Sequence, residues 1–564
     1  MSQAHKIVVL KFGHSILKDE TDISVVIAEA YLYLRAQYKI FLVVSALGNT
    51  TNELLDHVKN IFPDGIIDAP NRSRAELLAS GEIISSNLVS IGFNQAGIKS
   101  YNLNQSVLKT TGDILDSDPI SLDVASVNQL FDSYDVLVLP GFIGVNSDNQ
   151  VTLLGRGGSD FSAVFAAHNL SAEKCVLYKD SNGIVDDITL VEEQQKIYSH
   201  VTYEYCLALP YPVVQHKALK YACDHQEQII IKNIYSQSQS IVSSKKEYDL
   251  DYIKPIKKTR VVILGLGTVG LGVFHKLLKN SKFFEVVGIA VKNLNKHDKH
   301  GINAGILSTD THEILSRDYD ILIELVGGTI AKEFILTALK RQKHVVTANK
   351  LVVAEAWDEL HTVAKENKVS LKYSAAVAGV IPVLETIINL RKNDIVIAEV
   401  SGILNGTSNF ILGNIDKGFA INDAIKDAQK QGYAESDPTL DINGMDALYK
   451  INIISRLSFD REPYSVSVQG LEEIANLKKD NNKSTKLVAT SKIIDNKVVA
   501  SVQLLQLDKF HKFSNVLDAN NCVIIKTKDG QEFVLEGRGA GRWPTAVAVY
   551  ADILDLNLKG DNYA

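Results

Sequence analysis

A carboxylate and an ammonium group lie four residues apart in the C-terminal half of the chain, at Asp446 and Lys450. Residues at this spacing share one face of a helix. The carboxylate can orient the ammonium group and hold its charge, and such a lysine can handle the proton of a reacting hydroxyl group. A second lysine, Lys350, follows a strand-like run, His344–Thr347. Taken alone, Asp446 and Lys450 would more often form a surface ion pair.

A glycine-rich turn precedes these residues and follows a run typical of a strand. Gly265 permits the turn, Gly267 lets the backbone approach a pyrophosphate, and Gly270 lets helix and strand pack closely. The N-terminus of the helix supplies N–H groups for the anion. The expected contacts are Gly265, Gly267, Thr268, Val269 and Gly270. The pattern predicts a dinucleotide site, although an ordinary α/β unit can also contain a glycine turn.

The next two strand-like runs are expected to end beside the same cofactor. The first, Val286–Val291, is followed by Lys292, where an NAD site usually carries Asp or Glu for the ribose 2′-hydroxyl. A cation can bind a 2′-phosphate, which favours NADP, but a solvated lysine explains the residue equally well. Lys296 follows it. The second run, Ile321–Val326, ends at Gly327 and Gly328, and Gly327 is a further expected cofactor contact.

The N-terminal half places other polar groups at the ends of predicted strands. Lys11 ends the first strand and is followed by Gly13, His14 and Ser15. Lysine and backbone amides at the carboxyl edge of an open sheet suit triphosphate oxygens. Residues 155–160, Gly-Arg-Gly-Gly-Ser-Asp, form a glycine-rich turn into a helix, whose amides could also hold phosphate.

These groups require elements that position them. Apolar runs alternate with amphipathic patterns through residues 6–235, which indicates an α/β domain with a largely parallel sheet. The predicted strands are Ile7–Leu10, Phe41–Ser45, Val136–Leu139 and Ile229–Ile231. Residues 235–259 are polar, serine-rich and charged, and are expected to be a linker. A new strand, Val261–Leu264, then opens a second α/β unit.

From about residue 258 to the C-terminus the chain resembles homoserine dehydrogenases. The shared blocks are 321–328, 344–350, 375–382, 402–409, 432–450 and 537–546. The resemblance implies that Lys350 and Lys450 lie at the reacting oxygen, and leaves open which of them transfers the proton. It also implies that Glu435, Asp441 and Asp446 hold the amino and hydroxyl groups of the substrate.

The resemblance further implies a monovalent cation held by the backbone carbonyls of Val377, Gly379 and Ile381. Family members also use a glutamate at the position of Ser374. Its loss removes a charged oxygen ligand, so the carbonyls alone would have to hold the ion.

Residues 5–233 resemble aspartate kinases, and residues 155–160 are the most specific block. By this resemblance, Lys11 stabilises the transferring phosphoryl group of ATP bound with Mg²⁺. The residues implied to contact aspartate are Ser45, Glu82, Arg156 and Ser159. Those implied on the nucleotide side and the catalytic edge are Gly157, Gly158, Asp160 and Asp180. Phosphoryl transfer depends mostly on positioning and charge neutralisation, which these groups can supply.

The first half also departs from the kinase pattern. His14 and Ile16 replace a glycine and a serine, and Asn182 replaces an aspartate. The proline and arginine of a Thr-Asp-Pro-Arg segment are missing after Asp186, and Lys217 replaces a proline. An active kinase is favoured. A dead scaffold and a ligand-binding regulatory module remain alternatives. The roughly 25 residues between Ile234 and Arg260 leave no room for the two ACT modules usual in such bifunctional enzymes.

Together the two resemblances imply an α/β chain with an amino-acid-kinase-type open sheet and a Rossmann domain that carries an inserted α+β catalytic domain. The expected parts are a kinase-like domain at 1–234, a linker at 235–259, a Rossmann domain at 260–380, a catalytic domain at 381–540 and a C-terminal helix at 541–564 that returns to the Rossmann domain. The implied small molecules are L-aspartate, ATP, aspartate semialdehyde, homoserine and NADP or NAD.

Composition excludes several other classes of protein. The net charge of -7 gives no basic footprint for nucleic acid, and no apolar run reaches the length of a membrane span. The 4 cysteines lack C-x-x-C spacing, which argues against a disulfide framework and a zinc site. These features predict a cytoplasmic enzyme, and the family suggests a homo-oligomer.

Overall fold

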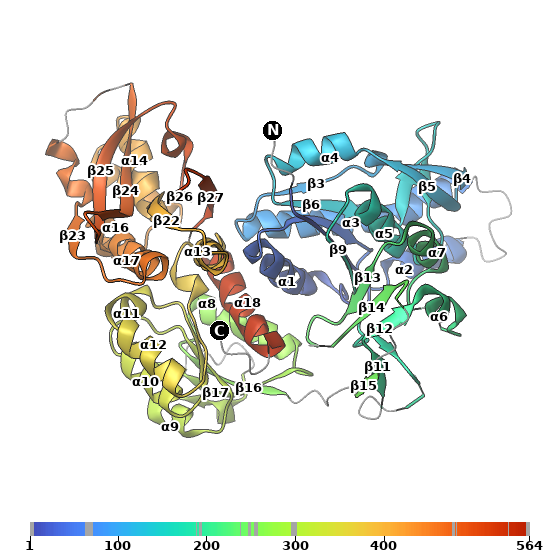
Figure 1. Cartoon of the computed structure of the whole chain (residues 1–564), viewed down its shortest axis with the longest axis horizontal. Coiled ribbons are helices and arrows are strands. Elements are labelled where there is room, and N and C mark those ends of the chain that lie inside the picture. The colour runs from blue at the N-terminus through green and yellow to red at the C-terminus, as the bar shows by residue number, and fades with distance from the viewer. Residues whose placement is uncertain are drawn as a thin grey trace. The chain divides into compact units, whose positions relative to one another are not determined.

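The computed structural model describes residues 5–61, 71–187, 189–190, 195–211, 213–236, 238–245, 250–252, 258–294, 302–476, 480, 482–539 and 541–559. It divides into two compact units, one within residues 1–257 and one within residues 258–556 (Figure 1). None of the helices in these described ranges is both long and apolar enough to cross a membrane.

The first unit is built on an eight-stranded sheet in the order β12-β14-β13-β9-β1-β2-β6-β3. Its strands are β1 (Ile7–Phe12), β2 (Lys39–Val44), β3 (Ser100–Asn102), β6 (Val136–Pro140), β9 (Lys174–Tyr178), β12 (His200–Thr202), β13 (Ile229–Lys232) and β14 (Gln239–Ser243). All neighbouring strands are parallel except β13 and β14. The carboxyl ends of β1, β2 and β9 therefore meet at one edge, where an open α/β sheet binds ligands.

Alternation along β1 sets the direction of its lysine. Ile7 and Val9 pack in the core shared with α5 (Gly158–Asn169) and α7 (His216–His225). Side chains two residues apart point to the same face of a strand, so Lys11 also points toward α5. The first turn of α5 carries Asp160. Helices α1 (Ile23–Arg35) and α3 (Asn71–Gln95) pack against each other in the same unit.

The segment predicted as a linker is partly sheet. β14 lies inside it and pairs with β12 and β13, while β15 (Leu250–Tyr252) pairs with β11 (Lys196–Tyr198). The prediction was wrong there because Ser240 and Val242 are buried beside β13 in spite of the serine-rich composition. The Ser240 hydroxyl donates to the Tyr198 carbonyl at 2.6 Å, which satisfies it inside the fold.

The second unit begins with a six-stranded parallel sheet in the order β18-β17-β16-β19-β20-β21. Its strands are β16 (Thr259–Leu264), β17 (Phe284–Ala290), β18 (Leu307–Ser308), β19 (Ile321–Glu324), β20 (His344–Thr347) and β21 (Leu371–Lys372). Counted along the chain this is the order 3-2-1-4-5-6 of a dinucleotide-binding sheet, whose ligand crevice lies where the order reverses. That point falls between β16 and β19.

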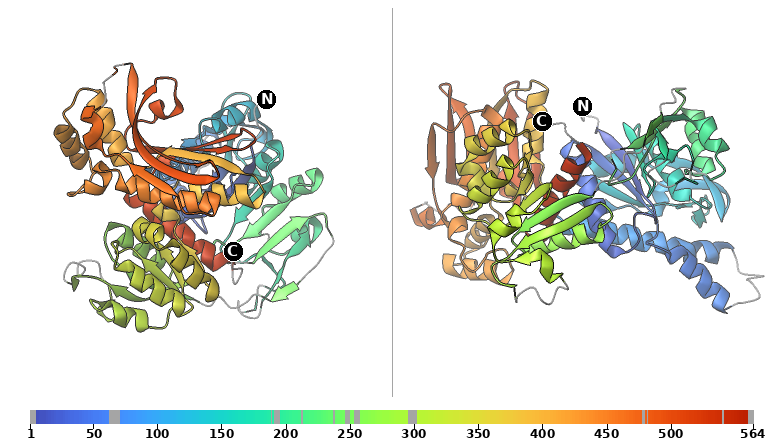
Figure 2. Two further views of the ribbon diagram at one scale, coloured as in Figure 1. Left: turned by 60° about the vertical axis from the view of Figure 1, so that its left-hand side comes forward. Right: turned by 90° about the horizontal axis from the view of Figure 1, so that it is seen from below.

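A second six-stranded sheet follows, in the order β23-β25-β24-β22-β26-β27. Its strands are β22 (Ile397–Ile403), β23 (Ser465–Val468), β24 (Lys483–Ile494), β25 (Lys497–Asp508), β26 (Asn520–Thr527) and β27 (Glu532–Arg538). Helices α13 (Val383–Lys392), α14 (Gly406–Asp416) and α17 (Met445–Phe459) share a core with the face that carries Val400, Ala489 and Val523 (Figures 1 and 2). This α+β arrangement places the N-terminal turn of α17 near the loop after β22.

The last helix, α18 (Arg542–Lys559), packs on the dinucleotide-binding part of this unit. The Tyr550 hydroxyl accepts a hydrogen bond from Asn280, at the end of α8 (Thr268–Lys279), at 3.1 Å. Its ring lies 6.3 Å from that of Phe284. Asp552, fully buried, accepts a hydrogen bond from the Ser374 hydroxyl at 2.9 Å.

Candidate active sites

Two lysines converge on the carboxylate of Asp446 in the second unit. Lys450, one turn along α17, lies 2.7 Å from Oδ2 of Asp446. Lys350, the first residue of α11 (Lys350–Glu355), lies 2.5 Å from Oδ1. The Lys450 ammonium group also donates to the carbonyl of Leu404 at 2.8 Å. The structure thus brings together two lysines that are 100 residues apart in the sequence.

The environments of the two lysines differ. Burial lowers the pKa of Lys450, although the charge of Asp446 opposes this. Burial also acts to lower the pKa of Lys350, but Asp446 outweighs it and the net shift is upward. The side chain of Lys350 is 35% exposed and that of Lys450 is 7% exposed. Lys350 is therefore held as a cation near solvent, whereas Lys450 is a buried ammonium that releases its proton more readily.

The pKa of Asp446 is lowered. Burial works against this direction, but the adjacent lysines, Lys450 first, outweigh it. Asp441 lies beside this pair, and burial raises the pKa of its carboxyl group. Glu435 is exposed, and its charge and that of Asp441 both favour the protonated form of Lys350. All three predicted carboxylates therefore act on the same group of side chains.

Asn405 connects these carboxylates, and the sequence analysis gave it no role. Its amide nitrogen donates to Asp441 at 2.6 Å and to Asp446 at 2.7 Å. Its oxygen caps α14 by accepting the backbone N–H of Ser408 at 2.7 Å. Asparagine before Gly-Thr-Ser is a typical start of a helix, and this was the signal available in the sequence.

A second hydrogen-bonded chain positions Lys350. Glu324, fully buried at the end of β19, accepts the Thr347 hydroxyl at 2.5 Å and the N–H groups of Val326 and Gly327 at 2.8 and 3.1 Å. Asn349 caps α11, and its amide nitrogen donates to the Gly328 carbonyl at 3.0 Å. The loops after β19 and β20 are thereby tied together at the edge where Lys350 begins its helix.

The glycine turn lies at the reversal of strand order, between β16 and β19. A Cβ on Gly270 would lie 2.2 Å from the Gly265 carbonyl oxygen, so Gly270 is required for packing. A Cβ on Gly267 would meet nothing within 4 Å, and the same holds for Gly327. Gly267 and Thr268 are exposed at the start of α8, and no side chain caps this helix. These residues fit a dinucleotide, whose pyrophosphate would approach the turn at Gly267.

The other predicted cofactor contacts lie at more exposed positions. Lys292 is exposed just beyond β17, and Lys296 lies outside the described residues. Val269 is half-buried in the first turn of α8.

Two of the positions predicted around the cation already have partners within the chain. The Ser374 hydroxyl lies 2.8 Å from Glu385 and 2.9 Å from Asp552, so it is engaged by two carboxylates. The Ile381 carbonyl accepts the N–H of Val383 at 2.7 Å. Val377 and Gly379 contribute neutral backbone oxygens, and Ser374 stands where family members have a charged ligand.

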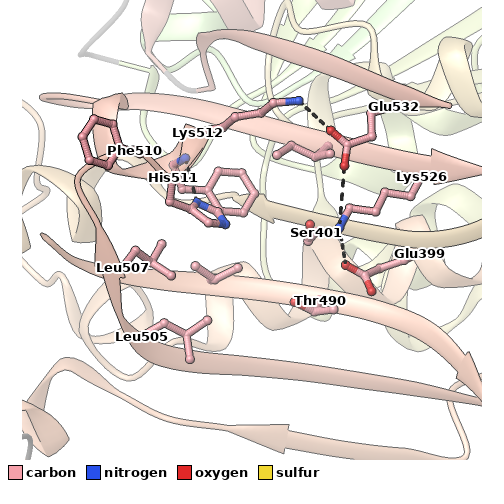
Figure 3. Close-up of a pocket in the computed structure, with 13 residues that line it drawn as sticks. Glu399, Ser401, Thr490, Leu505, Leu507, Phe510, His511, Lys512, Lys526 and Glu532 are labelled. Carbon is pink, nitrogen blue, oxygen red and sulfur yellow. Dashed lines mark hydrogen bonds and ion pairs between the residues drawn. The ribbon is translucent and has the colours of Figure 1, made fainter. Parts of the chain in front are cut away.

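A pocket of about 370 Å³ is lined by side chains of β22, β24 and β26 that alternate along these strands with those of the core face (Figure 3). Ser401, Val488 and Ile524 line its floor. Its charged groups pair with one another, since Glu532 lies 2.6 Å from Lys512 and 3.8 Å from Lys526. It contains none of the predicted site residues.

The first unit repeats the arrangement of two lysines on one carboxylate. Lys11 lies 2.9 Å from Oδ1 of Asp160 and Lys179 lies 2.8 Å from Oδ2. Burial lowers the pKa of Lys11 to about 8, opposed by Asp160. The pKa of Asp160 is lowered, because the charges of Lys11 and Lys179 outweigh the effect of its burial. Lys179 was not among the predicted site residues.

The predicted aspartate contacts gather beside Lys11. The Ser45 hydroxyl donates to that of Ser159 at 2.9 Å. Glu82 accepts the N–H of Ala46 at 3.4 Å, and its other oxygen is buried without a hydrogen-bond partner. Burial raises the pKa of Glu82 to about 7. This carboxyl group is suited to receive a cationic group of a ligand.

Three further predicted residues lie at the surface of this site. Arg156 and Asp180 are exposed, and Gly157 precedes α5 as its N-cap, with a φ of +80°. Gly158 instead serves packing, because a Cβ there would lie 2.7 Å from that of Leu154. His14 is exposed. Burial, with the charges of Lys11 and Lys179, lowers its pKa, so the ring is neutral at pH 7.

Both units match families of known proteins. Residues 382–554 match the family model for homoserine dehydrogenase and residues 265–374 match that for its NAD-binding domain. The homoserine dehydrogenase of Bacillus subtilis (strain 168) is 36% identical over 319 residues, which are 53% of this chain and 73% of the relative. The chain belongs to the homoserine dehydrogenase family. Residues 6–233 match the amino acid kinase family, so the family's dehydrogenase is here fused to a kinase-type domain.

Other homoserine dehydrogenases are similar to the same half. That of Neisseria gonorrhoeae (strain ATCC 700825 / FA 1090) is 36% identical over 319 residues, covering 53% of this chain and 73% of the relative. The crystal structure of a homoserine dehydrogenase from Thiobacillus denitrificans is 33% identical, with a TM-score of 0.48 over 54% of this chain and 74% of that chain.

Proposed function

We propose that the second unit interconverts aspartate 4-semialdehyde and homoserine with NAD(P)H, and that the first unit phosphorylates the side-chain carboxylate of L-aspartate with MgATP. The observation that carries the first activity is the convergence of Lys350 and Lys450 on Asp446. The matching family models and the glycine turn at the strand-order reversal support it.

Bound NAD(P)H would supply a hydride to the carbonyl carbon of the aldehyde. The chain has to supply a proton to the oxygen and hold the negative charge that develops there. Lys450 is the better proton donor, because burial makes its ammonium group more acidic. Lys350 remains charged and stabilises the oxyanion. In the reverse direction Lys450 takes the hydroxyl proton of homoserine.

The carboxylates around the lysines suit the other end of the substrate. Asp441 and Glu435 carry charge beside Lys350, and Asn405 fixes Asp441 at 2.6 Å. A substrate ammonium group would be attracted to this side of the site. Homoserine and aspartate semialdehyde both carry that group, whereas a simple alcohol does not. The exposed Lys292 favours NADP over NAD.

The kinase activity is supported by Lys11, Ser45, Glu82 and Ser159, which lie together at the carboxyl edge of β1 and β2. Lysine beside a helix N-terminus can neutralise transferring phosphoryl oxygens. The exposed His14 beside Lys11 favours the alternative of a scaffold without activity, because the family has glycine there.

Two assays on the full chain test the proposal. We expect NADPH to be consumed when aspartate semialdehyde is added, and hydroxylamine to trap an acyl phosphate when L-aspartate and MgATP are added. Absence of NADPH consumption would refute the dehydrogenase. Absence of hydroxamate alone would leave the first unit as a scaffold.

A further inference from the structure

We propose that Lys179 is a second phosphate-contacting lysine of the first unit, forming with Lys11 a clamp that holds the polyphosphate of the nucleotide. This inference rests on the proposed nucleotide site of that unit, and it assigns a residue that neither the sequence motifs nor the resemblance singled out.

The topology brings the two lysines together. β1 and β9 are parallel neighbours, and Lys11 pairs in register with Leu177. Lys179 follows the last residue of β9, so both lysines reach the same carboxyl edge of the sheet. The N–H of Lys179 donates to the Lys232 carbonyl at 3.0 Å, which fixes its backbone against β13. The backbone position of Lys179 is therefore fixed by hydrogen bonding to the sheet.

The charges at this edge leave one positive charge uncompensated. Asp160 lies between the two ammonium groups, at 2.9 Å from Lys11 and 2.8 Å from Lys179. It also accepts the N–H of Gln215, at 3.4 Å. One carboxylate cannot neutralise two ammonium groups in a buried site, and an anion between them would complete the balance.

Access is consistent with a ligand. The side chain of Lys179 is 16% exposed, against 7% for Lys11 and 5% for Asp160. The site is thus open on the Lys179 side. Asp160 lies in the first turn of α5, a 12-residue helix that no side chain caps. The start of this helix adds a partial positive charge for the same anion.

Calorimetric titration of the full chain with magnesium tripolyphosphate, with saturating NADPH present to block the dinucleotide site, tests the clamp. Hydrogen bonds between charged groups imply that Lys179→Met weakens this binding about ten- to hundredfold. Lys179→Arg should keep most of the affinity. Lys174→Met is the matched control, because Lys174 is exposed at the opposite end of β9 and should have no effect.

The outcomes separate the possible roles of Lys179. A Lys179→Met variant that binds tripolyphosphate as tightly as the wild type overturns the inference, and so does a wild type that does not bind it. Equal weakening of adenosine and tripolyphosphate would show a purely structural residue and would also overturn it. Binding that depends on Lys179 in a chain that forms no acyl phosphate would refute the kinase activity and support the clamp.

Discussion

At the scale of residues, the two units share one arrangement of charges. A buried carboxylate, Asp160 or Asp446, holds two lysines that reach it from different elements. In the first unit the two lysines outnumber Asp160, and in the second unit Asp446 and its neighbouring carboxylates keep Lys350 charged. A charge acts more strongly where burial reduces its contact with water. Such a site suits reactions in which an oxygen gains negative charge, namely phosphoryl transfer and carbonyl reduction.

Glu82 is expected to titrate near neutral pH. Its pKa in the folded chain is about 7, against about 4.3 for an unperturbed glutamate. The folded chain therefore keeps this proton over the range in which the unfolded chain has lost it. The stability tied to this proton is present at acid pH and is lost as pH rises through about 7. Infrared difference spectra between the wild type and Glu82→Gln should show a protonated carboxyl band that disappears with a midpoint near pH 7.

A carboxyl band already absent at pH 5 would contradict this account. Glu53→Gln is the control, because Glu53 lies near the start of α2 (Thr50–Ile61), outside the site, and its loss should remove no band that titrates near neutrality.

The sequence predicted some of these residues and not others. The four-residue spacing of Asp446 and Lys450 was sufficient to predict their contact, because a helix brings residues at this spacing together by itself. Asn405 and Lys179 were missed because their roles depend on which elements are neighbours in the fold: Asn405 contacts Asp446 at the start of α17, and Lys179 follows β9 beside β1. Spacing along the chain does not report that neighbour relation.

At the scale of elements, several site residues lie at the first turns of helices. Asn405 caps α14 and also binds two carboxylates. Asn405→Ala should lower kcat/KM for aspartate semialdehyde about a hundredfold, since it removes two hydrogen bonds to charged groups, and should cost about 1 kcal/mol of helix capping. Steady-state kinetics and thermal unfolding measure the two effects.

Asp310→Ala is the matched control for that variant. Asp310 caps α9 (Thr311–Ser316) by accepting the N–H of His312 at 2.9 Å and lies outside the site. It should lower stability and leave kcat/KM unchanged. Wild-type kinetics in Asn405→Ala would show that the amide has only a capping role.

The glycine turn allows a separate test. Gly267→Ala introduces a Cβ into open space at a φ of -73°, so the fold should be unchanged. The same methyl group would occupy the approach of the pyrophosphate, and NADPH affinity should fall roughly tenfold or more. Gly270→Ala would instead place a Cβ 2.2 Å from a carbonyl oxygen and should destabilise the second unit. Fluorescence titration with NADPH and thermal unfolding distinguish them; unchanged NADPH binding in Gly267→Ala would refute the assignment.

The presence of a strand could be predicted from the sequence more readily than the sheet to which the strand belongs. The predicted strand Val261–Leu264 lies within β16, because a run of buried β-branched residues identifies it. β14 was taken for a linker, because serine is read as a loop residue unless its hydroxyl has a partner inside the fold. Ser240 has one, the carbonyl of Tyr198, and only the packed sheet reveals it.

At the scale of the whole molecule, each unit has its own core and its own set of site residues. The position of Lys350 after a strand was predicted from the run His344–Thr347, whereas the Rossmann domain with an inserted catalytic domain was implied by the family resemblance. The role of each site residue can be tested in one unit without using the chemistry of the other.

We expect Lys450 to supply the proton in the dehydrogenase unit. The rate of NADPH-dependent reduction of aspartate semialdehyde by Lys450→Met tests this, with Lys11→Met as the matched variant in the other unit. Loss of a general acid should lower kcat roughly a hundredfold or more without weakening NADPH binding, whereas Lys11→Met should reduce the semialdehyde at the wild-type rate and fail to form acyl phosphate. A Lys450→Met enzyme with wild-type kcat would contradict the account.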